Sequence, residues 1–238
     1  MQRRSETGET MNARARQAAG NLLARHREIT LRRNFRLLGL DWDLLPGVYA
    51  PHLSQSSALY AEWIPYPVHG SLCEIGSGTG YVAVTAALRG CDAVTAIDMS
   101  RAAADNTRLN AVRHGVADRV RVACGDMFAP LEAGDRFDLI YWNSNFVEAP
   151  SDEGTADDLE RAFFDPGYVA HDAFLRDAGG HLNPGGRLML GFTDLGNPAR
   201  IGEIAARHGW RPAVLRAARC AAPEGEINYQ LVEFLRDR

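Results

Sequence analysis

The residues best suited to chemistry are one acid and three glycines at a fixed spacing. Glu74 lies in the apolar run 71–75, and Gly76, Gly78 and Gly80 follow at alternate positions before a helix-forming run. A strand, a glycine turn and a helix in this order bring backbone N–H groups against a ligand, and glycine permits the positive φ values of the turn. Dinucleotide sites use G-x-G-x-x-G, whereas here the third glycine comes one residue early. The pattern therefore predicts a nucleotide-binding turn whose glycine spacing differs from that of dinucleotide sites.

This spacing, E-x-G-x-G-x-G, resembles the motif of class I S-adenosylmethionine (SAM)-dependent methyltransferases. The resemblance implies that SAM is the cofactor and that the turn containing Ser77 holds it. It also implies that Glu74 orients the glycine loop and the methionine part of the cofactor. Methyl transfer from a sulfonium needs no metal, and we expect none.

Acids also end the next two apolar runs. Asp98, followed by Met99, stands where a carboxylate can accept both hydrogen bonds of a ribose diol. Asp98 could instead cap the following helix, although Ser100 is the better cap. The resemblance assigns Asp98, with Met99 beside it, to the ribose of SAM. It assigns Asp126 to the adenine amino group and the backbone N–H of Met127 to the adenine ring.

A fourth apolar run, 137–142, leads into Asn143-Ser144-Asn145-Phe146. This segment resembles the N-P-P-[YF] signature of amino methyltransferases, which include adenine-N6 and glutamine-N5 enzymes. An amide oxygen of Asn143 and the carbonyl of Ser144 could accept the two N–H bonds of a planar NH₂ group, while Phe146 stacks on the substrate. Such positioning can supply up to roughly 7–11 kcal/mol. Both prolines are replaced, however, and the rigid φ that would aim the carbonyl is lost.

A general base would be useful if the acceptor were an aliphatic amine, a hydroxyl or an acidic carbon. Glu148 is the first choice because it lies nearest the motif, and other candidates follow it: Asp152, Glu153, Asp165, Tyr168 and His171. The polar insertion 147–170 is long enough to be a functional loop, and we expect it to be the substrate lid. We place His171 on the exposed face of a helix over 171–178.

The elements that must position these residues alternate between strand and helix. Apolar runs at 71–75, 93–97, 120–124, 137–142 and 187–193 predict parallel strands joined by right-handed helical crossovers. Two further runs, 213–220 and 227–235, have so short a link that they predict an antiparallel hairpin. We therefore expect an α/β, Rossmann-like fold. Its seven-stranded, mostly parallel sheet ends in an antiparallel C-terminal hairpin, has helices on both faces and carries a small N-terminal extension of helices and strands.

Length and composition are consistent with one main domain. The 238 residues can bury one sizeable core, and we expect a disordered tail (1–12), an N-terminal extension (13–68) and a SAM-binding domain (69–238). No apolar run could span a membrane, no signal peptide is evident, and the four cysteines lack metal-like spacing, so a cytoplasmic protein is expected. All 26 basic residues are arginine, which excludes Schiff-base and phosphate-loop lysine chemistry.

The charge is uneven along the chain. Residues 1–36 carry nine arginines and three glutamates, a net +6, which leaves −10 for the remainder of a chain with net charge −4. A basic arm could attract an anionic substrate or nucleic acid, or it could simply be a solvated helix surface. The acidic body lacks the basic stripe of an RNA binder and argues against nucleic acid without excluding it. The arm could also pack across a homodimer.

The expected function is SAM-dependent methyl transfer to a small molecule, most plausibly to nitrogen. The alternatives are an amino methyltransferase acting on RNA or protein, and an oxygen or carbon methyltransferase of a small metabolite. A nicotinamide oxidoreductase is disfavoured by the glycine spacing and the absence of lysine. A SAM-binding regulator without activity would also fit the altered acceptor motif.

Overall fold

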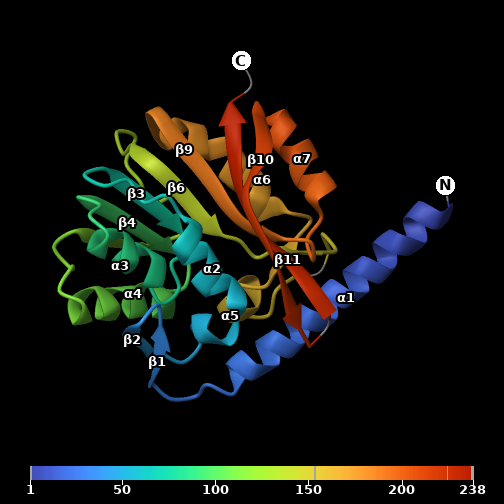
Figure 1. Ribbon diagram of the computed structural model, residues 1–238, viewed down its shortest axis with the longest axis horizontal. Helices are drawn as coiled ribbons and strands as arrows, with labels where there is room; N and C mark the ends of the chain where they lie inside the picture. The colour runs from blue at the N-terminus through green and yellow to red at the C-terminus, as the bar shows by residue number, and fades with distance from the viewer. Residues whose placement is uncertain (1, 153, 224, 237–238) are drawn as a thin grey trace.

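The fold is built on a seven-stranded sheet. The computed structural model describes residues 2–152, 154–223 and 225–236, with side chains from residue 13 onward. The strand order is β10-β11-β9-β6-β3-β4-β5 (Figure 1). The bounds are β3 (Ser71–Ile75), β4 (Ala93–Asp98), β5 (Val120–Cys124), β6 (Phe137–Asn143), β9 (Leu182–Thr193), β10 (Trp210–Ala222) and β11 (Gly225–Arg236). The predicted fold class is confirmed.

The strands β5, β4, β3, β6 and β9 are parallel neighbours, as the alternation of strand and helix predicts. The strand β11 pairs antiparallel with β9 and with β10, which confirms the predicted hairpin. Because the parallel strands share one direction, the ends of β3, β4 and β6 meet at one edge of the sheet. The glycine turn, Asp98 and Asn143 therefore lie at the same edge.

Helices cover both faces of the sheet and create two cores. The helices α2 (Gln55–Trp63), α3 (Tyr81–Leu88) and α4 (Arg101–Arg113) contribute to one core, and α6 (Val169–Asp177) and α7 (Pro198–Arg207) contribute to the other. Side chains of β6 alternate between them: Leu139 and Tyr141 belong to the first core, Ile140 and Trp142 to the second. This period of two is what a strand buried on both faces requires. Short 3₁₀ helices precede α2 and follow α6, η1 (Pro51–Leu53) and η2 (Ala178–His181).

The N-terminal extension consists of α1 (Gln2–Arg27) and a hairpin of β1 (Arg33–Leu37) and β2 (Leu40–Leu44). Helical backbone thus continues through residues 2–12, where the sequence predicts a disordered tail; this stretch has no proline and one glycine, so it can extend the helix. Residue 1 lies outside the described residues. Residues 48–50 form no strand, and the chain enters η1 directly after them.

A polar network fixes the hairpin to the glycine turn. Asn110 of α4 donates to the carbonyls of Asp43 (2.9 Å) and Thr79 (2.8 Å), and its side-chain oxygen accepts the N–H of Asp43 (2.8 Å). The buried carboxylate of Asp43 also pairs with Arg32 and Arg113, at 2.8 and 2.9 Å. The extension is therefore part of the structure that holds the turn in place.

The insertion after β6 is ordered around a small sheet. It contains β7 (Val147–Ala149), α5 (Asp158–Arg161) and β8 (Phe164–Pro166), and β7 and β8 pair in parallel. We call residues 155–166 the lid. No helix in the described part of the chain is both long and apolar enough to cross a membrane.

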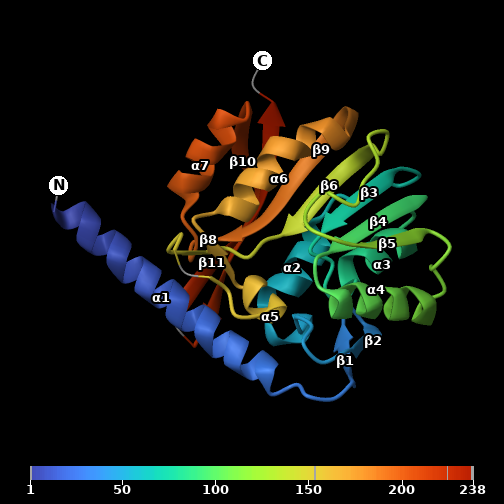
Figure 2. The ribbon, with the colours of Figure 1, turned by 180° about the vertical axis from the view of Figure 1, so that it is seen from behind.

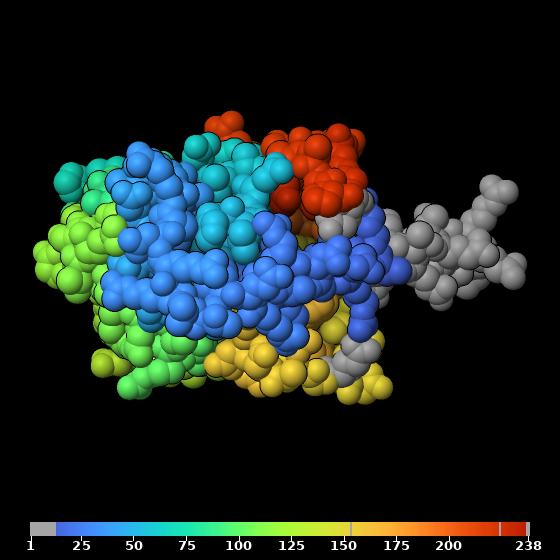
Figure 3. Space-filling model, turned by 90° about the horizontal axis from the view of Figure 1, so that it is seen from below, coloured from blue at the N-terminus to red at the C-terminus, as the bar shows by residue number. Residues whose placement is uncertain are grey.

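The helix α1 crosses the molecule beside the lid and the hairpin β10–β11 (Figure 2). Seen from below, the coloured part of α1 lies between the red hairpin and the yellow lid (Figure 3). Arg14 donates to the carbonyl of Glu226 (2.6 Å), and Arg27 pairs with Asp157 of the lid (3.1 Å). Its inner face buries Ala15, Ala19, Leu23 and His26. Helix α1 thus packs on its own chain, at the edge where the parallel strands end.

Candidate functional site

A cavity of about 620 Å³ lies at this edge of the sheet. It is bounded by the glycine turn, by the ends of β4 and β6, by the lid and by α1, and its volume falls in the range of small-ligand sites. Most of the predicted site residues line it: Glu74, Gly76, Ser77, Gly78, Asp98, Met99, Asp126, Met127, Asn143, Ser144 and Phe146. Gly80 and Glu148 are not among the lining residues.

Two of the three glycines in the turn have distinct roles. All adopt positive φ, at +66° for Gly76, +56° for Gly78 and +77° for Gly80. A Cβ on Gly80 would lie 2.7 Å from a methyl carbon of Thr107, so this glycine serves packing against α4. A Cβ on Gly78 would meet nothing within 4 Å, which leaves its backbone open to a ligand. The turn therefore combines one packing glycine with one exposed to the cavity.

Asp98, at the end of β4, holds the glycine turn by hydrogen bonds. Its carboxylate accepts the N–H of Gly78 (2.8 Å) and the N–H of Ser100 (2.9 Å). Burial raises the pKa of Asp98, and these two hydrogen bonds act against that shift. Ser100 is the residue before α4, but its side chain makes no capping hydrogen bond. Asp98 is therefore held by two N–H groups while lining the cavity, which suits a ribose acceptor.

Glu74 is 1% exposed and accepts the N–H of Ala83 in the first turn of α3 (2.9 Å). Burial raises the pKa of Glu74 well above its usual range. The carboxyl group joins the end of β3 to the helix that follows the turn. This geometry agrees with the expected role in orienting the glycine loop.

The adenine end of the predicted site is formed by the segment after β5. Asp126 and Met127 line the cavity, and Met127 has φ +45°, a value that few non-glycine residues adopt. The preceding Gly125 donates its N–H to the carbonyl of Asp98 (2.9 Å), which places this segment beside the end of β4. Phe128 is buried in the core and stacks on Phe174.

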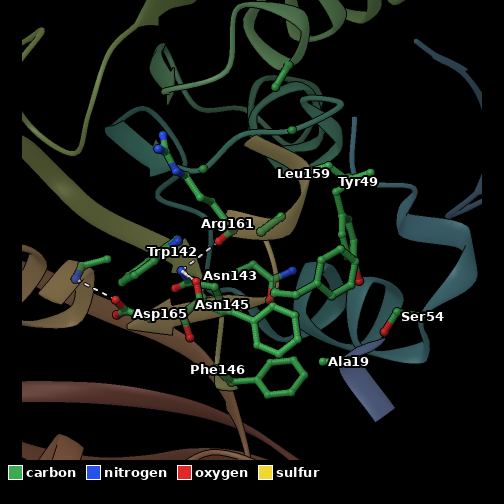
Figure 4. A pocket seen from close by; sticks show the side chains of 18 of the residues that line it. Ala19, Tyr49, Ser54, Trp142, Asn143, Asn145, Phe146, Leu159, Arg161 and Asp165 are labelled. Carbon is green, nitrogen blue, oxygen red and sulfur yellow. Dashed lines mark hydrogen bonds between the residues drawn. The ribbon is translucent and has the colours of Figure 1, made fainter. Parts of the chain in front are cut away.

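The acceptor motif is held by side-chain hydrogen bonds instead of prolines. Ser144 donates from Oγ and from its N–H to the carbonyl of Gly191, at 2.9 and 3.3 Å. Asn145 donates from Nδ2 to the lid carbonyls of Arg161 (2.9 Å) and Phe164 (3.1 Å), as Figure 4 shows in part. The loop that lost its fixed φ is therefore anchored on two sides, to β9 and to the lid.

Asn143 and Phe146 face the space enclosed by this loop. The amide nitrogen of Asn143 lies 3.5 Å from the hydroxyl of Tyr81, and its side chain is directed to the cavity (Figure 4). Tyr49, Leu159 and Phe146 surround the same space. The acceptor side of the cavity is thus mainly aromatic and aliphatic, with a few polar groups at one end.

Helix α1 and an aromatic cluster close the cavity on the side away from the sheet. The His26 ring stacks on Tyr49 with centroids 4.8 Å apart and meets Phe163 edge-on at 5.1 Å. Burial lowers the pKa of His26 to about 4, so the ring is neutral at physiological pH. This cluster was not expected from the sequence, because the three aromatic residues lie far apart along the chain.

Glu148 does not support the role of general base. It stands on β7 between the buried Val147 and Ala149, so strand alternation directs it to the opposite side. Its carboxylate accepts a hydrogen bond from Asn197 (2.9 Å). Glu148 is therefore close to the acceptor motif in sequence but does not line the cavity.

His171 is buried, and the expectation of an exposed helix face is wrong. The helix α6 begins at Val169, two residues earlier than expected. Asp165, which lines the cavity, accepts from Nδ1 of His171 (2.6 Å) and from the N–H groups of Ala170 (3.1 Å) and His171 (3.0 Å). Asp165 thereby joins the end of the lid to the start of α6; an aspartate shortly before a helix is the only sequence signal of this role.

Comparisons with known proteins agree with this geometry. Residues 72–164 match the family described as "Methyltransferase domain". The release factor glutamine methyltransferase of Bordetella pertussis is 33% identical over 188 residues, which cover 74% of this chain and 62% of that protein. The ribosomal protein uL3 glutamine methyltransferase of Bradyrhizobium diazoefficiens is 34% identical over 123 residues, which cover 49% of this chain and 38% of that protein. The chain thus spans less than two thirds of either relative.

The fold has similar solved structures. The Thermus 16S rRNA N2 G1207 methyltransferase, in complex with AdoMet and guanosine, superposes with a TM-score of 0.61 at 22% identity over 87% of this chain and 51% of that one. A ribosomal protein L11 methylase from Lactobacillus delbrueckii gives a TM-score of 0.57 at 18% identity over 82% of this chain and 84% of that one. At such identities the similarity concerns the fold.

Proposed function

As this chain belongs to the class I SAM-dependent methyltransferases, we propose that it transfers a methyl group to a nitrogen atom of a small acceptor molecule. The observation that carries the proposal is the placement of Asn143, the Ser144 backbone and Phe146 in one cavity with the glycine turn and Asp98. The cofactor side and the acceptor motif meet there, under α1 and the lid.

The residues of the cofactor side fit SAM. The open backbone at Gly78 and the carboxylate of Asp98 suit a ribose, while Asp126 and the Met127 backbone suit an adenine ring. Bound SAM supplies a methyl group on a positively charged sulfur. The protein has then to hold the acceptor nitrogen in line with that methyl group and to keep water away.

On the acceptor side, the oxygen of Asn143 and the carbonyl of Ser144 accept the two N–H bonds of the nitrogen. This orients its lone pair and stabilises the proton that must later leave. The hydrogen bonds of Ser144 to Gly191 hold the carbonyl in place without a proline. A nitrogen acceptor is favoured over a hydroxyl or an acidic carbon because Asn143 and the Ser144 carbonyl offer two hydrogen-bond acceptors for an NH₂ group. Of the candidate bases, Glu148 does not line the cavity, and Asp165 lines it but already accepts three hydrogen bonds from the start of α6.

A small acceptor is favoured because helix α1 lies across the face where the parallel strands end (Figure 3). The second candidate is a glutamine side chain of a protein. It is favoured by the similarity to two proteins named as glutamine methyltransferases. Both candidate acceptors would be held in the same way at Asn143. They differ in size, because either a small molecule or a glutamine side chain of a protein would have to enter the cavity past α1.

The test uses SAM labelled in the methyl group. The protein is incubated separately with a metabolite extract, with ribosomal and release-factor proteins, and with tRNA. Label in small molecules supports the proposal, whereas label confined to protein supports the second candidate and contradicts the first. Asn143→Ala should lower turnover about 10- to 100-fold, the value of one or two buried hydrogen bonds, with SAM affinity nearly unchanged. Equal loss of both would move Asn143 to cofactor binding.

A further inference from the structure

Arg25 lines the cavity and pairs with no carboxylate of the residues that the structure describes. Two arginines line the cavity, Arg25 of α1 and Arg161 of the lid. Arg161 is engaged, since its Nε donates to Thr155 Oγ1 (2.9 Å) and its guanidinium lies 3.6 Å from Asp158. Within the described part of the chain, Arg25 makes no hydrogen bond and no ion pair.

The position of Arg25 follows from the geometry of α1. Ala18, Asn21, Leu22 and Arg25 line the cavity, and this spacing of three and four residues is one face of a helix. The helix is fixed at both ends of this face, by Arg14 at the hairpin and by Arg27 at the lid. The Arg25 guanidinium is therefore carried by a helix that is fixed at both ends of its inner face.

Arg25 is an exposed residue whose charge acts on two neighbouring histidines. Its charge contributes to lowering the pKa of His26 and the pKa of His52, after burial, which is the larger cause in both. His26 is neutral and stacks on Tyr49, another cavity residue. A planar guanidinium beside neutral aromatic rings, without a protein partner, is suited to binding a carboxylate through two parallel hydrogen bonds.

We propose that Arg25 binds a carboxylate of a molecule held in the cavity, an inference that rests on the proposed function. The carboxylate has two possible sources. One is the methionine part of the cofactor, and the other is an acidic group on the acceptor. In the second case the acceptor is an amine or amide that also carries an acid.

The first arm of the test concerns the cofactor source. Calorimetry compares S-adenosylhomocysteine with 5′-methylthioadenosine, which lacks the amino-acid part, on wild type and Arg25→Gln. If the cofactor supplies the carboxylate, the variant binds S-adenosylhomocysteine about 10- to 100-fold more weakly and 5′-methylthioadenosine equally well. Arg25→Lys should lose less affinity than Arg25→Gln, because lysine keeps the positive charge but cannot make two parallel hydrogen bonds to a carboxylate.

The second arm concerns the acceptor source. The protein saturated with S-adenosylhomocysteine is titrated with matched acids and amides: L-glutamine against L-glutaminamide, and 4-aminobenzoate against 4-aminobenzamide. If the acceptor supplies the carboxylate, wild type prefers one of the acids about tenfold or more, and Arg25→Gln removes that preference.

The control is Arg33→Gln. Arg33 also contributes to lowering the pKa of His52, but it does not line the cavity. The proposal is overturned if Arg25→Gln has no more effect than Arg33→Gln in either arm, or if wild type distinguishes neither member of any pair. Because both arms measure binding, the absence of methyl transfer would contradict the proposed function without contradicting the role of Arg25.

Discussion

Replacing Asn145 by alanine should release the lid from the acceptor motif. The side chain donates two hydrogen bonds, to the carbonyls of Arg161 (2.9 Å) and Phe164 (3.1 Å). At about 0.5–1.5 kcal/mol for each bond, their loss destabilises the closed lid by about 1–3 kcal/mol. The opening equilibrium of the lid should then rise about 5- to 150-fold, because 1.4 kcal/mol corresponds to a factor of ten.

Hydrogen exchange followed by mass spectrometry measures this opening. Peptides covering the lid should exchange faster in Asn145→Ala by that factor, while peptides covering β3 and β4 should not change. Asn145→Asp should open the lid further, since a carboxylate oxygen would face two carbonyl oxygens. Asn34→Ala, which removes an exposed amide of β1, is the control. Unchanged exchange in the lid, or an equal rise in lid and sheet, would refute the reasoning.

Three other predictions concern the cofactor side and the roof of the cavity. Asp98→Ala should abolish SAM binding, and unchanged affinity by calorimetry would contradict the site assignment. Gly80→Ala should cost about 2 kcal/mol or more in thermal unfolding, from a φ of +77° and the clash with Thr107. Gly78→Ala has no clash, so it should cost about 1–2 kcal/mol from its φ of +56° and should also weaken S-adenosylhomocysteine binding. The pKa of His26 is about 4 in the folded protein, against an ordinary value of 6.5. As the pH falls, the unfolded chain therefore binds a proton at this histidine before the folded protein does. The free energy of unfolding should fall by up to about 3 kcal/mol between pH 6.5 and pH 4. Urea unfolding of His26→Phe should show a flatter pH dependence over that range.

The sheet and the cofactor side were predictable because their signals are local. An apolar run that ends in an acid or a glycine fixes both the strand and the residue at its end. Asp98 and the glycines of the turn were found in this way, and the parallel sheet then brings them together. The pairing of the last two strands followed from a link of a few residues.

The acceptor side was less predictable because its contacts join distant segments. Asn145 bonds to residues 16 and 19 positions away, and Ser144 bonds to a carbonyl 47 positions away. Nothing in the spacing of the motif indicates these partners. Glu148 was misplaced because no strand was expected at 147–149, and the alternation of β7 directs its side chain away from the buried side. His171 was misplaced because α6 begins two residues earlier than expected.

The crossing of α1 over the cavity also has a consequence for the order of folding. Arg14 meets the carbonyl of Glu226, so the first helix of the chain is held by its last hairpin, 212 positions away. This one contact of the roof can therefore form during synthesis only after residue 226 has been made. A chain released early, or unzipped at its C-terminal strands, would keep the glycine turn while leaving the acceptor side uncovered. Closure of the cavity at this point thus depends on two segments that lie 212 positions apart in the sequence.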